Sequence, residues 1–483
     1  MLVLLSALLL LQAPSAGDIE SQLRRFTAVY AAVESEAAER IDPDQAVYSG
    51  AIPGMLRNLD PHSVFLSPDN FAQLKRMQDS VSKGFGSVVS VVPGRVIVLQ
   101  SLPGTPSAKA GLAAGDEILA INGIRLDRLE VEQLIEVLTA SRQKPASLDV
   151  RRPGEARLLQ FVLTPEELQA PSVERAFFVR PGVGYIKVTS FDAQTGADIR
   201  KAIEKLGGGK LKALILDLRG NPGGAVSAAL ETASLFLKPG QTIFTVTGRA
   251  KEATPEKVPD TATPYSFPLA VLVDGSSASA SEIVAGSLQD HDRAVIVGWS
   301  TYGKGLVETV FPLSDNTGLA LTTAFYYTPS GRSIQKPLAG GQIGSVPALE
   351  SASEYRTDSG RRVTGGGGIQ PDRRVQEKPQ TRLQMFLDAS GSLTTFAAEY
   401  VRTHPGLSQS FEVTPHVLDQ FQAFLSSRGV LPRLAEWSQD RTWMTSRLKT
   451  EIFNLAFGVD KGDEVEAQRD ASILAALQAL GTD

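Results

Sequence analysis

Cysteine is absent from this chain of 483 residues, and histidine occurs only four times. Without cysteine there are no disulfides and no thiolate ligands for zinc. No His-Glu-x-x-His segment occurs, and the histidines are scattered at His62, His291, His404 and His416. The sequence therefore predicts neither a metal site nor a serine paired with histidine, and we expect no cofactor.

Long basic stretches and membrane-length apolar stretches are missing as well. The net charge of −5 argues against a nucleic-acid partner. The apolar run Leu2–Leu11 is too short to span a bilayer, and the small residues that follow it at 12–17 are typical of a signal peptide. We predict a signal peptide over residues 1–16 and a periplasmic or other extracytoplasmic location, with which the lack of cysteine is compatible.

The remaining chain is long enough for about three domains. Apolar residues at helical spacing, such as Leu23, Phe26 and Val29, predict a helical region over 17–69. From 70 to 165, short apolar strands alternate with glycine turns around one helix. A further α/β segment covers 166–375, and helical patterns such as Leu383 and Phe386 return over 376–483.

The serine-rich run 275–283 and the lysine of the segment 301–305 carry the clearest chemical information. A serine hydroxyl is a poor nucleophile until a base lies within reach, and a lysine whose burial keeps it neutral is such a base. Ala278 and Ala280 permit a tight turn around Ser279, and the apolar residues 283–286 predict a helix behind it. The Ala280 N–H at this helix start would stabilise an oxyanion. Alternatively, the turn is an ordinary helix N-cap.

A second informative segment begins with the apolar run 213–216. Asp217, Arg219 and a glycine-proline turn follow it, which indicates a buried strand with polar residues at its carboxyl end. This is the end of a strand at which α/β folds place their chemistry. The N–H of Gly223 or Gly224 would supply a second oxyanion donor. The turn matches neither the phosphate-loop nor the dinucleotide-binding pattern.

Several segments in the same order resemble the carboxy-terminal processing proteases of the tail-specific serine peptidase family. They are Leu214–Gly224, Ser277–Glu282, Ala285–Asp290, Gly303–Gly305 and Thr328–Gln335. The resemblance implies that Ser279 is the nucleophile and that Lys304, 25 positions later, is its base. It assigns a supporting ion-pair network to Asp217, Arg219 and Glu282, for which a purely structural role is the alternative. Ser277 and Ser281 are expected to bond within the turn or to cap the helix.

The chain departs from this family pattern at Glu308, where the family usually has a glutamine that orients the lysine. A carboxylate also accepts a hydrogen bond from Lys304. When ionised, however, it favours the charged ammonium and works against a neutral base. Strand alternation around Glu308 permits an alternative in which this side chain faces solvent.

The segment Gly104–Gly123 resembles the core of a PDZ domain, in which an extended peptide adds to a sheet edge. The resemblance implies a carboxylate-binding loop formed by Gly84, Phe85, Gly86 and Ser87, and a pairing strand that begins at Val88. The helix 130–138 would line the groove through Leu134 together with Val137 or Leu138. The alternative is that these apolar residues form only the domain core.

We therefore expect an α/β multidomain protein: an α/β serine peptidase core (166–375) with an inserted PDZ domain (70–165) and helical N- and C-terminal regions. The expected function is a serine endopeptidase that captures proteins or peptides with exposed apolar C-termini and cleaves them with a Ser279–Lys304 dyad. A catalytically weak PDZ adaptor or holdase is the alternative that Glu308 suggests. The resemblance also implies a homodimer or adaptor contact through the C-terminal helices, for which packing within the chain is the alternative.

Overall fold

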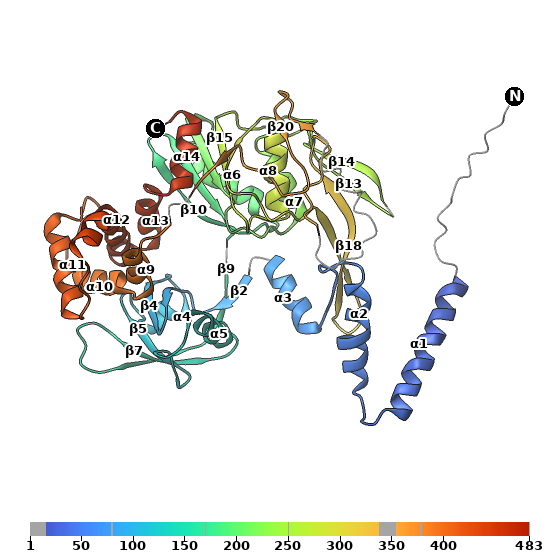
Figure 1. Cartoon of the computed structure of the whole chain (residues 1–483), viewed down its shortest axis with the longest axis horizontal. Helices are drawn as coiled ribbons and strands as arrows, with labels where there is room; N and C mark the ends of the chain where they lie inside the picture. Colours follow the sequence, from blue (N-terminus) through green and yellow to red (C-terminus); the bar gives the residue numbers. More distant parts are fainter. Residues whose placement is uncertain are drawn as a thin grey trace.

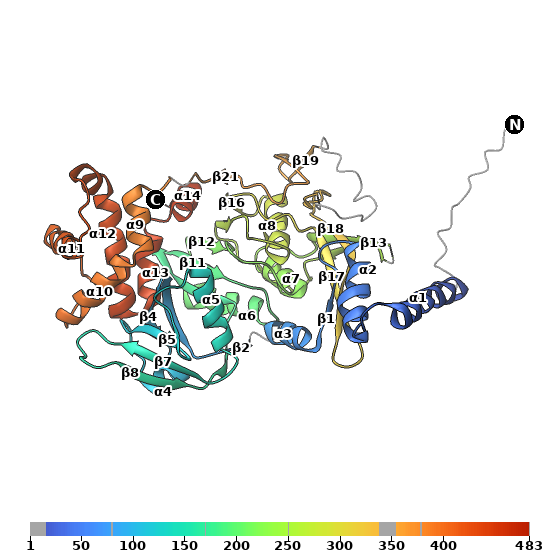
Figure 2. The same ribbon diagram turned by 60° about the horizontal axis from the view of Figure 1, so that its bottom comes forward.

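The computed structural model describes residues 16–78, 81–169, 171–249, 251–337, 354–376 and 379–482. All of the predicted signal peptide except Ala16 lies outside these residues. Within the described ranges, no helix combines the length and apolar character needed to cross a membrane. Figures 1 and 2 show four parts: N-terminal helices, a small β-rich domain, a central α/β core and a helical C-terminal region.

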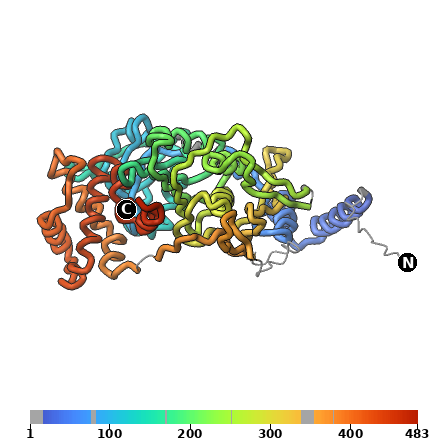
Figure 3. Tube along the Cα trace, turned by 90° about the horizontal axis from the view of Figure 1, so that it is seen from above, coloured from blue at the N-terminus to red at the C-terminus, as the bar shows by residue number. Residues whose placement is uncertain are grey.

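The N-terminal region contains more than the predicted helices. Its elements are α1 (Ala16–Glu36), the π-helix η1 (Gln45–Ala51), α2 (Ile52–Arg57), β1 (Val64–Leu66) and α3 (Pro68–Gln78). Helix α1 projects away from the body of the molecule (Figure 3). Strand β1 is an apolar tripeptide that pairs antiparallel with β18 (Gly318–Tyr327) of the core. The region before the β-rich domain thus completes a sheet of the core, and α3 crosses the expected boundary at 69/70.

The small β-rich domain is a five-strand antiparallel path, β3-β4-β5-β7-β8, with β6 beside β5. Its elements are β3 (Ser87–Val92), β4 (Arg95–Ser101), α4 (Pro106–Ala110), β5 (Glu117–Ile121), β6 (Ile124–Arg125), α5 (Val131–Ser141), β7 (Ala146–Arg151) and β8 (Leu159–Leu163). Apolar side chains from β4, β5, β7 and α5 form its core. A separate ribbon of β2 (Val81–Gly84) and β9 (Glu166–Gln169) joins this domain to the rest of the chain.

The central core contains a six-stranded sheet in the order β10-β11-β12-β15-β16-β21. These strands are β10 (Val173–Arg180), β11 (Val183–Val188), β12 (Ala213–Asp217), β15 (Leu269–Val273), β16 (Val295–Gly298) and β21 (Arg373–Arg374). The pairs from β11 onward are parallel. Helices α6 (Thr195–Lys205), α7 (Val226–Ser234) and α8 (Ala280–Asp290) and the short η2 (Gly208–Lys210) accompany it, and the first three bury its larger apolar cluster. Because β12 and β15 are fully buried, their sequences are continuous apolar runs.

A second, five-stranded sheet of the core follows the path β1-β18-β13-β14, with β17 also pairing with β18. It contains β13 (Thr242–Gly248), β14 (Lys251–Lys257) and β17 (Leu306–Pro312). A separate two-stranded ribbon, β19 (Tyr355–Arg356) with β20 (Arg362–Val363), follows β18 in the sequence. A register irregularity in the β17–β18 pairing falls between Val307 and Glu308. Such bulges redirect the side chain that follows them.

The C-terminal region is helical, as the sequence patterns predict. It comprises α9 (Arg382–Ala389), α10 (Ser392–Thr403), α11 (Pro415–Ser427), α12 (Leu434–Phe457), α13 (Val459–Ala467) and α14 (Ala471–Leu480). Helices α9–α12 share their own apolar core. In contrast, α14 packs its residues Ile473, Ala476 and Leu477 against the face of the six-stranded sheet opposite to α8. The last helices therefore tie this region to the core.

Candidate active site

Ser279 lies at the turn that connects β15 to α8, at the carboxyl end of a central parallel strand. Its φ of 53° is a left-handed conformation that is rare for a residue with a side chain. Strain of this kind persists where the surrounding structure enforces it, and it is concentrated at functional sites. Ser279 is only partly buried, whereas both of its neighbours, Ala278 and Ala280, are buried. The turn thus presents this residue at the start of α8.

The carboxylate of Glu282, in the first turn of α8, enforces the position of Ser279 and also that of Lys304. Its Oε2 accepts hydrogen bonds of 2.9 Å from the N–H of Ser279 and from the N–H of Lys304. Its Oε1 accepts bonds from Gly303 N–H at 2.7 Å and from Thr301 Oγ1 at 2.5 Å. Burial raises the pKa of Glu282, while the hydrogen bonds that it accepts oppose this shift. The predicted nucleophile and the predicted base are therefore anchored to one oxygen atom.

The Lys304 ammonium forms an ion pair with Glu308, whose Oε1 lies 3.1 Å from Lys304 Nζ. Both side chains are largely screened from solvent, with 21% and 26% of their surfaces exposed. The alternative in which Glu308 faces solvent is therefore wrong, because the irregularity between Val307 and Glu308 breaks the simple alternation of β17. In the described part of the chain no hydrogen bond links Lys304 Nζ to the Ser279 hydroxyl. Such catalytic bonds commonly tighten only when substrate is bound.

The predicted oxyanion donors lie around Ser279, but one of them is occupied. The loop 218–224 approaches so closely that a Cβ on Gly223 would lie 2.9 Å from the Cβ of Ser279. The Gly223 N–H donates to Asn221 Oδ1 at 2.9 Å, so it is not free to bind an oxyanion. Gly224 has a φ of 144°, and a Cβ there would meet the carbonyl of Phe191 at 2.0 Å. Of Gly223 and Gly224, Gly224 is therefore the better source of a second N–H group that could bind an oxyanion together with the N–H of Ala280.

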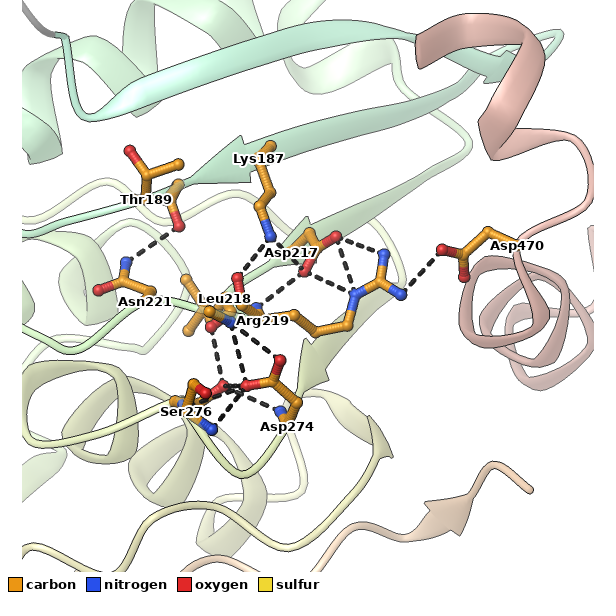
Figure 4. Close-up of polar contacts among 12 residues, drawn as sticks. Lys187, Thr189, Asp217, Leu218, Arg219, Asn221, Asp274, Ser276 and Asp470 are labelled. Atoms are coloured by element: carbon orange, nitrogen blue, oxygen red, sulfur yellow. Dashed lines mark hydrogen bonds and ion pairs between the residues drawn. The ribbon is translucent and has the colours of Figure 1, made fainter. Parts of the chain in front are cut away.

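Asp217 and Arg219 form an ion-pair network that extends to Asp470 (Figure 4). Arg219 donates to both carboxylate oxygens of Asp217 and, through Nη1, to Asp470 Oδ2 at 2.8 Å. Burial opposes the charge of Asp217, but the hydrogen bonds and charge of Arg219 hold its pKa below the usual range. Tyr185 and Lys187 also contact this carboxylate. Asp470 caps α14. The ion pair between Arg219 and Asp470 therefore links the loop 218–224 to the C-terminal helices.

The two serines beside Ser279 hold the loops of the site together. The Ser277 hydroxyl donates to the carbonyl of Leu218 at 2.8 Å, and the Ser281 hydroxyl donates to the carbonyl of Asn221 at 3.0 Å. Ser277 also bonds within the turn, to Asp274, as expected. The Ser281 hydroxyl neither bonds within the turn nor caps α8, the two roles expected for this pair of serines, because it reaches across to the loop 218–224. Both serines are fully buried and therefore structural.

A cavity of about 620 Å³ lies beside the edge strand β3 of the small domain. It is lined by the predicted residues Gly84, Phe85, Gly86, Ser87 and Val88, by Leu138 of α5, and by Arg175 and Asp460 from outside the domain. Gly84 belongs to β2, where it pairs with Glu166, rather than to a loop. The assignment of Leu134 to peptide contact is wrong. This side chain is fully buried in the domain core, and Leu138, one turn later, reaches the cavity.

His62 was not among the predicted site residues, yet its Nδ1 lies 3.8 Å from Glu308 Oε1. It belongs to the segment between α2 and β1. Its position in the sequence gave no indication of this contact, because only the pairing of β1 with β18 brings the segment to β17.

Comparisons with known proteins agree with this geometry. Residues 182–343 match the model of peptidase family S41, and residues 97–152 match a PDZ domain. A carboxy-terminal-processing protease of Bartonella bacilliformis is 36% identical over 332 residues, which cover 65% of this chain and 73% of that protein. Carboxyl-terminal-processing peptidase 2, chloroplastic, of Arabidopsis thaliana is 35% identical over 59% of this chain and 58% of its own length. A solved photosystem II D1 C-terminal processing protease is 25% identical over 73% of this chain and 86% of that one, with a TM-score of 0.40.

This chain belongs to peptidase family S41, as a serine peptidase of the carboxy-terminal processing group that carries a PDZ domain. The expected class of fold, an α/β peptidase core with a PDZ domain and helical regions at both ends, is confirmed.

The hydrogen bonds of Glu282 generate a first prediction. Both oxygens of Glu282 accept hydrogen bonds from backbone N–H groups. In Glu282→Gln, the amide NH₂ replaces one of these oxygens, whichever way the amide is oriented, so at least one buried backbone N–H loses its acceptor. We expect the free energy of unfolding to fall by about 1–3 kcal/mol, the cost of a buried donor without a partner. Peptidase activity should fall as well, because Ser279 and Lys304 share this anchor. Denaturant titration and a peptide assay measure the two effects.

The matched control for this change is Glu412→Gln, on the surface of the C-terminal region, where the carboxylate pairs with Lys449 and is 70% exposed. This substitution should leave both quantities close to wild type. A Glu282→Gln variant with wild-type stability and wild-type activity would show that Glu282 is not the anchor of the site.

Proposed function

We propose that this chain is an extracytoplasmic endopeptidase that hydrolyses peptide bonds with a dyad of Ser279 and Lys304. The observation that carries the proposal is the shared anchor: the backbone N–H groups of both residues bind the same oxygen of Glu282. Two segments that are separate in the sequence are thereby held side by side at the start of α8. The nucleophile–base pair that this chemistry needs would form between their side chains.

In the proposed reaction, neutral Lys304 removes the proton of the Ser279 hydroxyl as its oxygen attacks the scissile carbonyl. The N–H groups of Ala280 and Gly224 stabilise the negative charge that develops on the carbonyl oxygen. Lys304 then gives the proton to the leaving amine, and an acyl-enzyme remains. Lys304 next takes a proton from water, which attacks the ester, and the collapse of this second intermediate releases the acid and returns the proton to Ser279.

Substrate recognition is proposed to occur at the edge strand β3. A protein C-terminus would add to this edge as a further strand, and its carboxylate would meet backbone N–H groups near Gly86 and Ser87. Leu138 and Val88 line the adjoining cavity, which suits apolar side chains close to the C-terminus. We propose that residues 70–165 contain the PDZ domain and that residues 166–375, completed by β1 of the N-terminal region, form the peptidase core. Exposed apolar residues of the C-terminal region, including Phe386, Leu431 and Leu434, suit a homodimer or adaptor contact.

A catalytically weak adaptor or holdase is the second candidate, and the ion pair between Lys304 and Glu308 is the observation in its favour. A lysine held as an ammonium ion by a carboxylate is a poor base. The two candidates differ in whether Ser279 is needed for turnover of a peptide substrate.

The dyad predicts that Ser279→Ala and Lys304→Ala each lower kcat/KM by at least about a thousandfold, since each removes half of a unit that acts jointly. The assay is cleavage of an unfolded reporter protein with an apolar tail, with circular dichroism to verify folding. Ser276→Ala is the matched control, because Ser276 is an exposed serine of the same turn. Substantial turnover by Ser279→Ala would exclude this nucleophile.

The Glu308 carboxylate predicts a lower rate than a neutral side chain at this position would allow. Lys304 must be neutral to act as the base, and an ionised neighbour favours its charged form. Glu308→Gln removes that charge and should raise kcat/KM by about three- to tenfold, the effect of a partly exposed ion pair. The comparison is kcat/KM of both enzymes in the same buffer. Equal values would mean that Glu308 does not influence the base.

Recognition of the C-terminus predicts a dependence on the terminal carboxylate. Two reporters with the same sequence, one ending in a free carboxylate and one in an amide, differ only in the group that the loop near Gly86 would bind. We expect kcat/KM for the amidated reporter to be lower by about tenfold or more, because hydrogen bonds to a charged group are lost. Equal rates would show that the cavity beside β3 does not read the C-terminus.

A further inference from the structure

The proposed base has a third neighbour, His62, which the reaction described above does not use. Glu308 Oε1 lies 3.1 Å from Lys304 Nζ and 3.8 Å from His62 Nδ1. The same carboxylate oxygen thus faces two nitrogen atoms. The second distance is that of an ion pair rather than of a direct hydrogen bond, so the contact strengthens when the imidazole is protonated. With 19% of its surface exposed, the His62 side chain is mostly enclosed.

The loop that carries His62 is fixed by its own hydrogen bonds. Asp60 Oδ1 accepts the N–H of His62 at 2.7 Å and that of Ser63 at 2.8 Å, and Asp60 Oδ2 accepts the Ser63 hydroxyl at 2.7 Å. An aspartate that binds the two following N–H groups is a stable local turn. Burial opposes the charge of Asp60, but these hydrogen bonds hold its pKa below the usual range.

This loop is also fixed to the sheet that carries Glu308. The Thr322 N–H donates to the Ser63 hydroxyl at 3.1 Å, and Thr322 is the residue of β18 that lies opposite Glu308 in the register of β17 and β18. Strand β1, directly after the loop, pairs with the neighbouring residues of β18. The loop that carries His62 is therefore held beside Glu308 by a hydrogen bond to β18 and by the pairing of β1 with the same strand.

The backbone of Glu308 does not by itself fix the direction of the Glu308 side chain, so a contact with His62 helps to set it. Lys304 and Glu308 are four residues apart, but no helix carries them, and the strand irregularity lies directly before Glu308. The Lys304 ammonium and the His62 imidazole both lie beside one oxygen of this carboxylate, and two such contacts restrict its direction more than one does.

We propose that His62 is a positioning residue for the peptidase reaction, which holds the Glu308 carboxylate against Lys304 and so connects the N-terminal region to the base. This inference rests on the proposed Ser279–Lys304 dyad. The titratable groups that face His62 are Asp60 on its own loop, Glu308 on β17 and Lys304 next to Glu308.

The test is a double-mutant cycle of kcat/KM, with wild type, His62→Ala, Glu308→Gln and the double variant. We expect His62→Ala to lower kcat/KM by about three- to tenfold, the effect of a partly exposed ion pair. In the Glu308→Gln background the same substitution should have no further effect, because its target carboxylate is gone.

Conservative variants separate positioning from mere packing. His62→Asn and His62→Gln keep a polar side chain of comparable size but cannot carry the positive charge of an ion pair, so neither variant should recover the lost rate. A role in packing alone would allow both variants to recover it. If His62→Ala does not fold, His62→Gln replaces it in the cycle. His416→Ala, which changes an exposed histidine of α11, is the control and should match wild type.

Wild-type rates in His62→Ala and His62→Gln, or an equal loss in the Glu308→Gln background, would overturn the role of His62 while the dyad stands. Turnover by Ser279→Ala would instead overturn the dyad itself. The two failures are therefore distinguishable in one set of assays.

Discussion

The carboxylate of Glu282 is the interaction on which the site depends. Four donors from two segments of the chain converge on it: the N–H of Ser279, and from 301–304 the hydroxyl of Thr301 and the N–H groups of Gly303 and Lys304. A buried carboxylate is unfavourable unless its oxygens are fully hydrogen-bonded, so the loop 301–304 must close on the start of α8 for the core to be stable. Stability of the fold and assembly of the site are thus the same requirement.

Much of the fold was predictable because its patterns are local. The continuous apolar runs of β12 and β15 predict buried parallel strands, and the turns after them mark the sheet edge at which the site lies. The C-terminal helices follow from the spacing of their apolar residues. Strand β1 could not be predicted in this way, since a tripeptide becomes a strand only by pairing with β18, far along the chain.

The sequence allows the residues of a candidate site to be named, but it does not show the directions of their side chains. In the fold, the backbones of Ser279 and Lys304 lie side by side on Glu282. The sequence does not show that the Gly223 N–H is occupied by Asn221, or that Arg219 turns toward Asp470, because both depend on side-chain directions within a folded loop. The position of His62 is of the same kind, since it follows from a strand pairing. As a result, the least predictable contacts are those that join distant segments.

The pairing of β1 with β18 has a consequence for how the chain folds during synthesis. The ribosome releases β1 first, then the whole PDZ region, and only much later β18, which completes the five-stranded sheet. Until then the polar backbone of β1 has no native partner, and closing so long a loop has an entropic cost. Contacts of this range slow folding and extend the lifetime of incomplete sheets. The N-terminal segment would therefore be among the last parts to reach its place, and His62 would reach Glu308 only with it.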